Sequence, residues 1–258
     1  MDLRIGVGTF DVMIYNPLED NSLLLRHCPL DGNDESERLK QIETFIYDNP
    51  LLLSEFKTVT AIIESRSYLT VPSVIADTCD HLALLREADP DTDSRATIVE
   101  DRLDMFDARV LTPVASPTVN FLRRTFPNIR LYNAVSPLTR YCHANLTKGN
   151  TVKTFVNIRD RSLDIIVMSS TTLHLINRFE YRDINDAAYY ILNCTDDAEG
   201  EIAEILIGGV HDKRDLLMPL LRKFRVYVMP MIFPSAMFKA GADAMKAPFD
   251  LIILPLCE

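Results

Sequence analysis

The clearest alternation of apolar and polar positions lies in the second half of the chain. Phe155, Val156 and Ile158 indicate a first strand, and the nearly continuous apolar run over residues 163–168 indicates a second strand that is covered on both faces. Apolar and polar residues alternate over residues 173–179, which predicts a third strand. The polar breaks between these segments are short, so we expect the three strands to form an antiparallel meander.

A helix is expected after this meander, because Ile184, Ala187 and Ile191 fall on one face and Asp183 precedes them as an N-cap. The rest of this half alternates between strands and helices. We expect strands over residues 202–209 and 225–231, helices over 211–224 and 235–246, and a final buried strand over 249–256. Because an interior proline breaks a helix, the regular part of the first of these helices is expected to begin near Pro219.

The first half repeats this order of elements. We expect a helix over residues 35–47 and strands over residues 4–8, 10–16, 22–28 and 57–65. The stretch over residues 67–115 then interrupts the order with a helix and two strands. After it, a helix, a strand and a connecting helix are expected up to residue 146.

Each half therefore consists of a strand meander followed by alternating helices and strands. This order cannot give a purely parallel sheet, so the predicted fold class is α/β with mixed sheets, in two ribonuclease-H-like β-β-β-α-β-α-β halves. The polar residues 147–152 are the best candidate hinge. We predict a first half over residues 1–148, with a small subdomain inserted at about 65–112, and a second half over 149–258.

The interruption "VTAIIESRSYLTVPSVIADTCDHLALL" and the return "DARVLTPVASPTVNFLRRTFPNIRLYNAVSPLTRYCHA" complete a layout that resembles the actin-like ATPase superfamily. It is most similar to the bacterial branch that includes the cell-division actin homologue and the type IV pilus assembly actin-like protein, in which a small subdomain interrupts the first half. The chain also looks like a bacterial family of unknown function assigned to this fold. The resemblance implies an actin-like ATPase fold over nearly the whole chain.

The resemblance also implies a nucleotide site between the halves, to which each half contributes an Asp-x-Gly turn with a small hydroxyl residue. Glycine lets backbone amides approach phosphate, and the aspartates hold Mg²⁺. In the first half, "IGVGTFD" has Gly6 at the aspartate position, while Gly8 and Thr9 match the pattern. In the second half, "VNIRDRS" has Asn157 at the aspartate position and Arg159 at the glycine position.

Arg159 would fill the space in which a phosphate approaches, or would contact an anion directly. A third element, Gly208–Gly209 before a helix, matches the part of the site that supports adenosine. Asp11 and Asp160 lie near the turns but are displaced along the sequence, so they, or Asp164, are the alternative catalytic residues of an active enzyme. A purely structural reading is also open, in which the glycines only allow close packing and a tight turn. We expect no ATP hydrolysis, no cofactor and no metal site, with binding of ATP and Mg²⁺ as the alternative.

Composition narrows the classes of partner. The 258 residues carry a formal net charge of −10 with a pI near 5.0, which argues against binding to nucleic-acid backbones or anionic membrane surfaces. The five cysteines contain no CxxC pair, and histidines lie near them only at spacings that do not suit zinc, so we expect reduced, buried thiols. No signal peptide or membrane-inserting stretch is expected, which makes the cytoplasm the default location.

The sequence therefore favours a degenerate actin-like module, a pseudo-ATPase that acts as a scaffold by binding an unknown protein partner or a second copy of itself. One alternative is an ATPase or phosphotransferase with shifted acidic residues. Another is a sensor whose halves close on an anion or nucleotide through Arg159 and the Gly208–Gly209 backbone.

Overall fold

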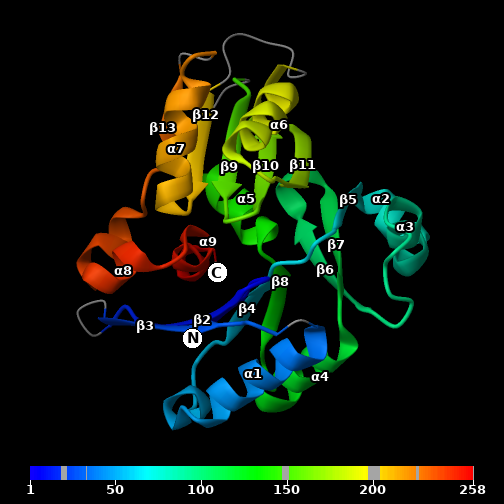
Figure 1. Ribbon diagram of the computed structural model, residues 1–258. Helices are drawn as coiled ribbons and strands as arrows, with labels where there is room; N and C mark the ends of the chain where they lie inside the picture. Colours follow the sequence, from blue (N-terminus) through cyan, green and yellow to red (C-terminus); the bar gives the residue numbers. More distant parts are fainter. Residues whose placement is uncertain (19–21, 33, 147–150, 197–203, 225–226, 258) are drawn as a thin grey trace.

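The computed structural model describes residues 1–18, 22–32, 34–146, 151–196, 204–224 and 227–257. These residues form two five-stranded sheets, one in each half, and a separate three-stranded sheet in the insert. Figure 1 shows the two halves stacked one above the other, with the insert on one side and the end of the chain between the halves. Both large sheets mix parallel and antiparallel strands, which confirms the predicted fold class. The predicted hinge lies mostly outside the described residues.

In the first half, the strand order is β3-β2-β1-β4-β8, and β4 and β8 run parallel to β1. Its strands are β1 (Asp2–Ile5), β2 (Thr9–Asn16), β3 (Ser22–Pro29), β4 (Thr60–Ile63) and β8 (Arg130–Asn133). β1 ends at Ile5, three residues earlier than predicted, because Gly6 N donates a hydrogen bond to Thr9 O at 2.8 Å and closes a tight turn.

Two helices cover one face of this sheet, α1 (Glu35–Tyr47) and α4 (Ser116–Thr125), and a short 3-10 turn over Pro50–Leu53 follows α1. The Asp34 side chain accepts a hydrogen bond from Glu37 N at 2.8 Å, which explains why α1 begins where the sequence predicts. Apolar residues of both helices pack with β1, β2 and β4 in one buried cluster.

The second half has the equivalent order, β11-β10-β9-β12-β13. Its strands are β9 (Lys153–Ile158), β10 (Ser162–Met168), β11 (Leu173–Glu180), β12 (Glu204–Gly209) and β13 (Val228–Pro230), and its helices are α6 (Ile184–Asp196) and α7 (His211–Leu221). Asn185 N donates to Asp183 Oδ1 at 2.7 Å, which confirms the predicted cap of α6. The prediction that α7 begins near Pro219 is wrong. The helix ends two residues beyond Pro219, so the proline interrupts only its last turn.

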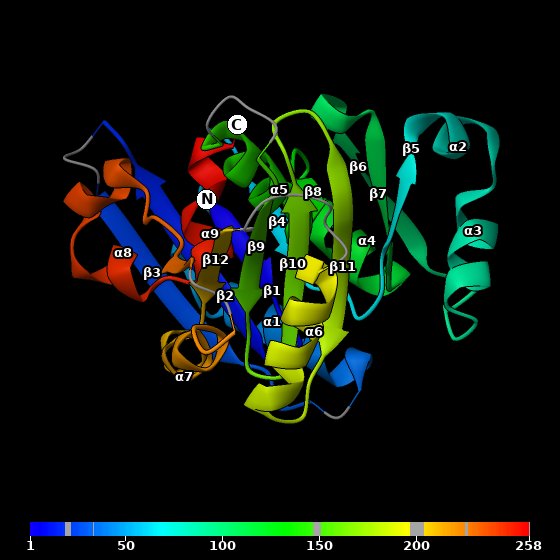
Figure 2. The same ribbon diagram turned by 90° about the horizontal axis from the view of Figure 1, so that it is seen from above.

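The insert contains more elements than predicted. In order these are β5 (Leu69–Pro72), α2 (Ser73–Thr78), α3 (His81–Ala88), β6 (Thr97–Leu103), a 3-10 turn over Asp104–Phe106 and β7 (Ala108–Val114). β5 is only four residues long and ends at a proline, which explains why the apolar pattern did not reveal it. Seen from above in Figure 2, the insert stands at one side of the two large sheets.

The C-terminal segment, residues 231–257, departs most from the prediction. The predicted final strand is instead α9 (Phe249–Ile252) followed by a 3-10 turn over Leu254–Leu256, and the predicted helix over 235–246 is divided. Gly241, at φ +85°, separates a 3-10 turn over Ser235–Ala240 from α8 (Ala242–Lys246). Pro248 and Pro255 flank the apolar run and prevent a regular strand ladder there.

The C-terminal segment and α5 (Val135–Ala144) join the two halves. Leu251, Ile252 and Ile253 are fully buried, in a core cluster that also contains Ile62 of β4 and Phe155 of β9. Each fully buried side chain of this size contributes roughly 1.5–3 kcal/mol relative to an exposed one. The halves therefore share one core through this segment.

Candidate functional site

Two tight turns of the same construction lie at the junction between the halves. In the β1–β2 turn, Gly6 N donates to Thr9 O at 2.8 Å, and in the β9–β10 turn, Arg159 N donates to Ser162 O at 2.8 Å. These are the turns in which phosphate-binding residues were predicted. Their matching hydrogen bonds make Gly6 and Arg159 equivalent positions of the duplicated fold.

The strand register fixes the remaining equivalences. Arg4 lies opposite Asp11 across β1 and β2, and Asn157 lies opposite Asp164 across β9 and β10. The residue equivalent to Asn157 is therefore Arg4. The sequence had suggested Gly6 as this equivalent, so the predicted correspondence is wrong by two residues. Each half thus places an aspartate on its second strand, directed at the junction.

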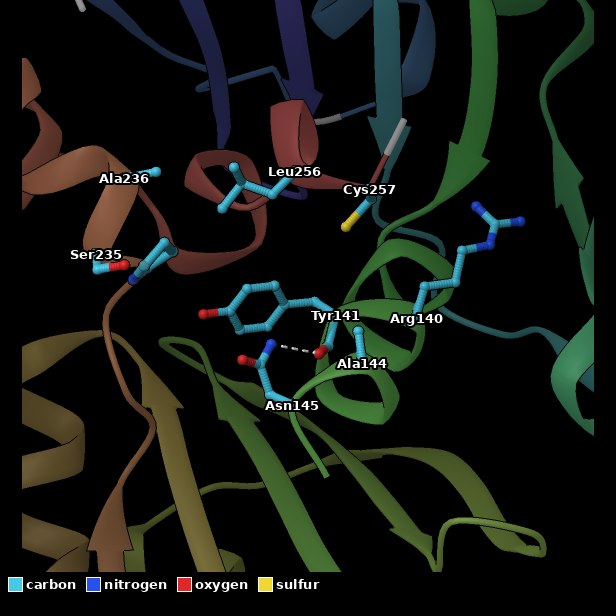
Figure 3. Close-up of a pocket in the computed structure, with 9 residues that line it drawn as sticks. Arg140, Tyr141, Ala144, Asn145, Ser235, Ala236, Leu256 and Cys257 are labelled. Atoms are coloured by element: carbon cyan, nitrogen blue, oxygen red, sulfur yellow. Dashed lines mark hydrogen bonds between the residues drawn. The ribbon is translucent and has the colours of Figure 1, made fainter. Parts of the chain in front are cut away.

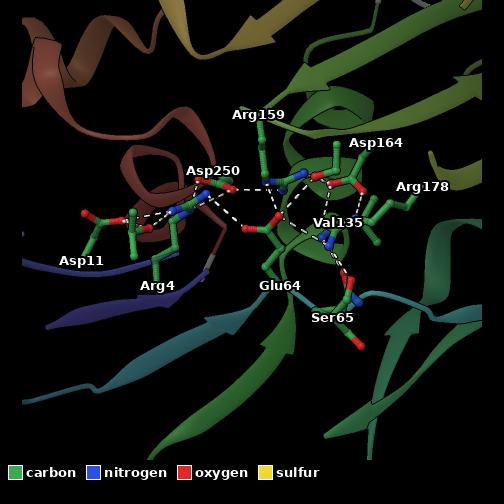
Figure 4. A network of polar contacts seen from close by, with 12 residues as sticks. Arg4, Asp11, Glu64, Ser65, Val135, Arg159, Asp164, Arg178 and Asp250 are labelled. Carbon is green, nitrogen blue, oxygen red and sulfur yellow. Dashed lines mark hydrogen bonds and ion pairs between the residues drawn. The ribbon is translucent and has the colours of Figure 1, made fainter. Parts of the chain in front are cut away.

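Side chains from both halves and from the C-terminal segment form one buried group of charges at this junction (Figure 4). We call this group the ion cluster, and it consists of Arg4, Asp11, Glu64, Arg159, Asp164, Arg178 and Asp250. Their side chains are at most 10% exposed. Three guanidinium groups and four carboxylates therefore occupy the region between the two turns.

Arg159 is the central cation of the ion cluster. Its Nη1 donates to Asp164 Oδ2 at 2.6 Å, and its Nη2 donates to Asp250 Oδ2 at 3.1 Å. Its Nε lies 3.6 Å from Glu64 Oε1, too far for a hydrogen bond. Arg159 therefore contacts acids from both halves and from α9.

Arg4 plays the corresponding part from the first half. Its Nη1 donates to Asp11 Oδ2 at 3.0 Å and to Thr9 Oγ1 at 2.9 Å. Its Nη2 donates to Glu64 Oε2 at 3.4 Å, and its Nε lies 3.0 Å from Asp250 Oδ1. Thr9, predicted as a phosphate-turn hydroxyl, is thus engaged by an arginine of its own half.

The second-strand aspartates have different outer neighbours. Asp164 accepts a hydrogen bond from Arg178 Nε at 2.9 Å and one from Tyr68 OH of the insert at 3.5 Å, and Arg178 also donates to the Ser65 carbonyl. In the first half, His27 Nδ1 lies 2.6 Å from Asp11 Oδ1. The His27 side chain is 55% exposed, so the first-half end of the cluster reaches solvent.

The arginines keep the buried acids ionised. Burial alone would raise the pKa of Asp164, but Arg159 and Arg178 outweigh it and lower that pKa to about 2. Burial opposes ionisation of Asp250 too, and Arg4 and Arg159 again hold its pKa below the usual value. Burial, with Asp164 alongside, raises the pKa of the Tyr68 hydroxyl well above its usual range. The cluster is therefore a network of formal charges.

The predicted glycine positions differ in the space around them. A Cβ at Gly208 would lie 2.9 Å from Met231 Sδ and 3.4 Å from a Phe249 ring carbon, so the C-terminal segment covers the predicted adenosine element. Gly209 has φ +103°, and a Cβ there would lie 2.0 Å from Ile158 O, so only glycine fits. A Cβ at Gly8 would meet nothing within 4 Å. The Gly-Gly pair therefore has a packing reason of its own.

A magnesium–nucleotide complex does not fit the residues present. The acids of the ion cluster all lie within ion-pair distance of an arginine, and the alternative catalytic residue Asp160 is exposed on its turn. Asn157, at the predicted aspartate position, is 2% exposed and carries no charge. Across the residues that the structure describes, no three His, Cys, Asp or Glu side chains are grouped to hold a metal ion.

Two hollows lie near the junction, and Glu64 of the ion cluster lines the first of them. A groove of about 490 Å³ runs between α1, the ends of β1 and β4, and the insert, and its lining includes Arg38, Arg66, Asp91 and Asp93. A pocket of about 440 Å³ lies between α5 and the C-terminal segment, where Tyr141 and Arg140 line it (Figure 3). Neither hollow contains the Arg159 side chain. We call the first one the insert groove.

The cysteines do not behave as one class. All five are free thiols, but only Cys142 is buried and Cys79 is exposed, so the expectation of buried thiols is wrong for most of them. His27 pairs with Asp11 rather than with the neighbouring Cys28.

Residues 1–227 match the family described as protein of unknown function (DUF3822). The chain belongs to this family. No curated protein sequence matches the chain.

The chain is similar to a Bacteroides thetaiotaomicron protein with actin-like ATPase fold and unknown function, with 21% identity over 92% of this chain and 93% of that chain and a TM-score of 0.78. It is also similar to a chain of the PilM-PilN type IV pilus biogenesis complex, with 12% identity over 99% and 96% and a TM-score of 0.55. These likenesses confirm the actin-like ATPase fold that the sequence resembles.

Sequence reasoning found part of this site and missed part. It singled out Gly6, Thr9, Arg159 and Asp11, all of which lie at the junction. It missed Arg4, Glu64, Arg178 and Asp250, which complete the ion cluster. Glu64 and Arg178 lie in predicted strand segments, and only the register across the strands directs them to the junction.

Helices within the described residues are all too short or too polar to cross a membrane.

Proposed function

We propose that this member of the DUF3822 family is a non-hydrolysing actin-like protein that acts as a scaffold through contact with a protein partner. The observation that carries the proposal is the Arg159 guanidinium, which stands at a predicted phosphate position and pairs with Asp164 and Asp250. A phosphate that entered there would have to displace these carboxylates. The free thiols and the negative net charge support the cytoplasm as the proposed location.

Energetics favour this reading over nucleotide binding. Removing one partner of a buried ion pair costs roughly 3–5 kcal/mol, because the other charge is left uncompensated. A ligand that binds with micromolar affinity releases about 8 kcal/mol in total. Displacing Asp250 from both Arg4 and Arg159 would therefore consume most of the binding energy of a nucleotide.

The similar solved structures support a role in protein contact. In the PilM-PilN type IV pilus biogenesis complex, a chain of this fold belongs to an assembly with another protein. The insert groove supplies an open surface for such a contact on this chain, since it is lined by side chains of three separate segments. We propose that the molecule bound there is either another protein or a second copy of this chain.

A thermal-shift series separates this function from its alternatives. The proposed function predicts no rise in melting temperature with ATP or ADP at millimolar concentration, with or without Mg²⁺. A rise that requires Mg²⁺ and disappears in Asp160→Ala would support an enzyme instead. A metal-independent rise that disappears in Arg159→Ala would support an anion sensor.

Capture of partners from cells that express the protein tests the scaffold itself. We expect a defined protein to be retained equally with and without ATP. The double variant Asp91→Lys and Asp93→Lys, in the insert groove, is expected to lose this protein. The matched control is Asp212→Lys with Asp215→Lys on α7, which reverses the same charge outside the groove. Loss in both double variants would contradict a role for the groove.

A further inference from the structure

We propose that Arg4 and Arg159 form an anion-binding site between the halves, and that the Asp250 carboxylate is its built-in ligand. Arg4 Nε donates to Asp250 Oδ2 at 3.2 Å and lies 3.0 Å from Oδ1, and Arg159 Nη2 donates to the same Oδ2 at 3.1 Å. Each half thus contributes one guanidinium to one carboxylate (Figure 4). The ligand class is a small carboxylate, since both guanidinium groups donate to Asp250 Oδ2 and Arg4 Nε also lies within ion-pair distance of Oδ1.

The two arginines are positioned without help from Asp250. Arg4 is held by Asp11 of its own half at 3.0 Å, and Arg159 is held by Asp164 of its own half at 2.6 Å. Both acids lie on strands in the middle of their sheets, β2 and β10, and are almost fully buried. The guanidinium groups therefore remain in place when the Asp250 carboxylate is removed, which is what preorganisation of a binding site requires.

The occupant belongs to a different part of the chain from the site. Asp250 lies on the four-residue helix α9, beyond the residues that match the family, whereas Arg4 and Arg159 lie within them. The site also has a spare donor, because Arg159 Nε is buried without a hydrogen-bond acceptor among the described residues. Arg4 and Arg159 hold the pKa of Asp250 below its usual value against the effect of burial, so the occupant is an anion.

Replacing Asp250 by two different residues tests the site with sodium formate as the probe. Asp250→Ala removes the carboxylate and leaves a space of its size, whereas Asp250→Asn removes the charge and keeps the space filled. We expect about 100 mM formate to raise the melting temperature of Asp250→Ala by roughly 3–6 °C for a dissociation constant of about 10 mM. We expect no comparable rise for Asp250→Asn or the wild type.

Controls distinguish a site from a general salt effect. Sodium chloride at the same ionic strength must not reproduce the rise, and the exposed variant Asp215→Ala must not respond to formate. The rise must decline from formate to acetate to propionate as the anion outgrows the space. A response that is independent of anion size, or equal in Asp250→Ala and Asp250→Asn, would overturn the proposal.

Folding itself is the readout if Asp250→Ala is unfolded on its own. Formate present during refolding must then recover folded protein, and chloride must not; equal recovery, or none in either salt, overturns the proposal. The inference rests on the filled junction of the proposed function, but the two fail separately. Nucleotide binding by the wild type would remove the proposed function, whereas the formate response concerns only the variant.

Discussion

The two halves of this protein share one strand order but use it differently at their junction. In both halves an aspartate on the second strand faces an arginine and a basic residue of the third strand: Asp11 with His27, and Asp164 with Arg178. In the first half the β1–β2 turn carries Gly6, and the His27 side chain that contacts Asp11 is 55% exposed. In the second half the turn carries Arg159 and Asp164 is 0% exposed.

A second equivalence separates the halves further. Glu64 N bonds to Ile5 O in the first half, and Val210 N bonds to Ile158 O in the second, both at 2.8 Å. Glu64 extends into the ion cluster, whereas Val210 is 38% exposed. The duplicated fold therefore determines at which positions side chains enter the junction. The residue types at these positions determine whether the side chains fill the space between the halves.

The largest expected effect comes from removing the second-strand aspartates. Asp164→Ala is expected to lower the free energy of unfolding by roughly 3–5 kcal/mol, because two buried guanidinium groups lose their carboxylate. Asp11→Ala is expected to cost roughly 1–3 kcal/mol, because its outer partner His27 reaches solvent. Urea unfolding measures both values, and equal costs would contradict the difference between the halves.

The glycines of the two halves give the next effect. Gly209→Ala is expected to lower the free energy of unfolding by roughly 3 kcal/mol, because φ is +103° and the new Cβ would meet Ile158 O. Gly8→Ala, where a Cβ meets nothing within 4 Å, is expected to change it by about 0.5 kcal/mol or less. Thermal unfolding of the two variants measures both changes. An unchanged stability of Gly209→Ala would contradict the close approach of β12 to the Ile158 backbone of β9.

A buried acid that has no arginine within ion-pair distance among the described residues should show the opposite pH dependence to those of the ion cluster. Asp101 accepts hydrogen bonds from Ser136 Oγ at 2.5 Å and Asn133 N at 2.7 Å, yet burial raises its pKa to about 6. The folded state then binds the proton more tightly, so the free energy of unfolding falls by up to about 3 kcal/mol as pH rises from 4 to 7. The free energy of unfolding, measured by urea unfolding between pH 4 and 7, should lose this decrease in Asp101→Asn. The exposed control variant Asp104→Asn should keep it.

Asp164 should give the smallest effect, with the reverse sign. Its pKa of about 2 in the folded protein lies below the unfolded value, so its contribution is present above pH 4 and is lost as pH falls toward 2. The loss amounts to about 2 kcal/mol. Acid unfolding of Asp164→Asn should lack this part of the transition, and an unchanged acid limb would mean that the aspartate is not held ionised by its arginines.

Most of the fold could be predicted from local patterns in the sequence. The caps at Asp34 and Asp183 and the apolar faces behind them fixed α1 and α6, because capping and helix periodicity act within a few residues. The run over residues 249–256 was read as a strand because all of it except Asp250 is apolar. Its burial comes from packing between two halves, which the run itself does not encode.

The site was predictable only in part for the same reason. Arg159 was identified because it breaks a local turn pattern. Its partner Asp250 lies 91 residues away, and Arg4 lies 246 residues from the same carboxylate. No periodicity links such positions, and their contact depends on the register of two sheets and the path of the C-terminal segment.

A crystal structure grown with Mg·ATP at millimolar concentration tests most directly the claim that side chains close the junction. We expect no nucleotide between the halves, with Arg159 still near 2.6 Å from Asp164 and 3.1 Å from Asp250. An ordered magnesium–nucleotide complex between the Gly6 and Arg159 turns, with Asp250 displaced, would contradict it.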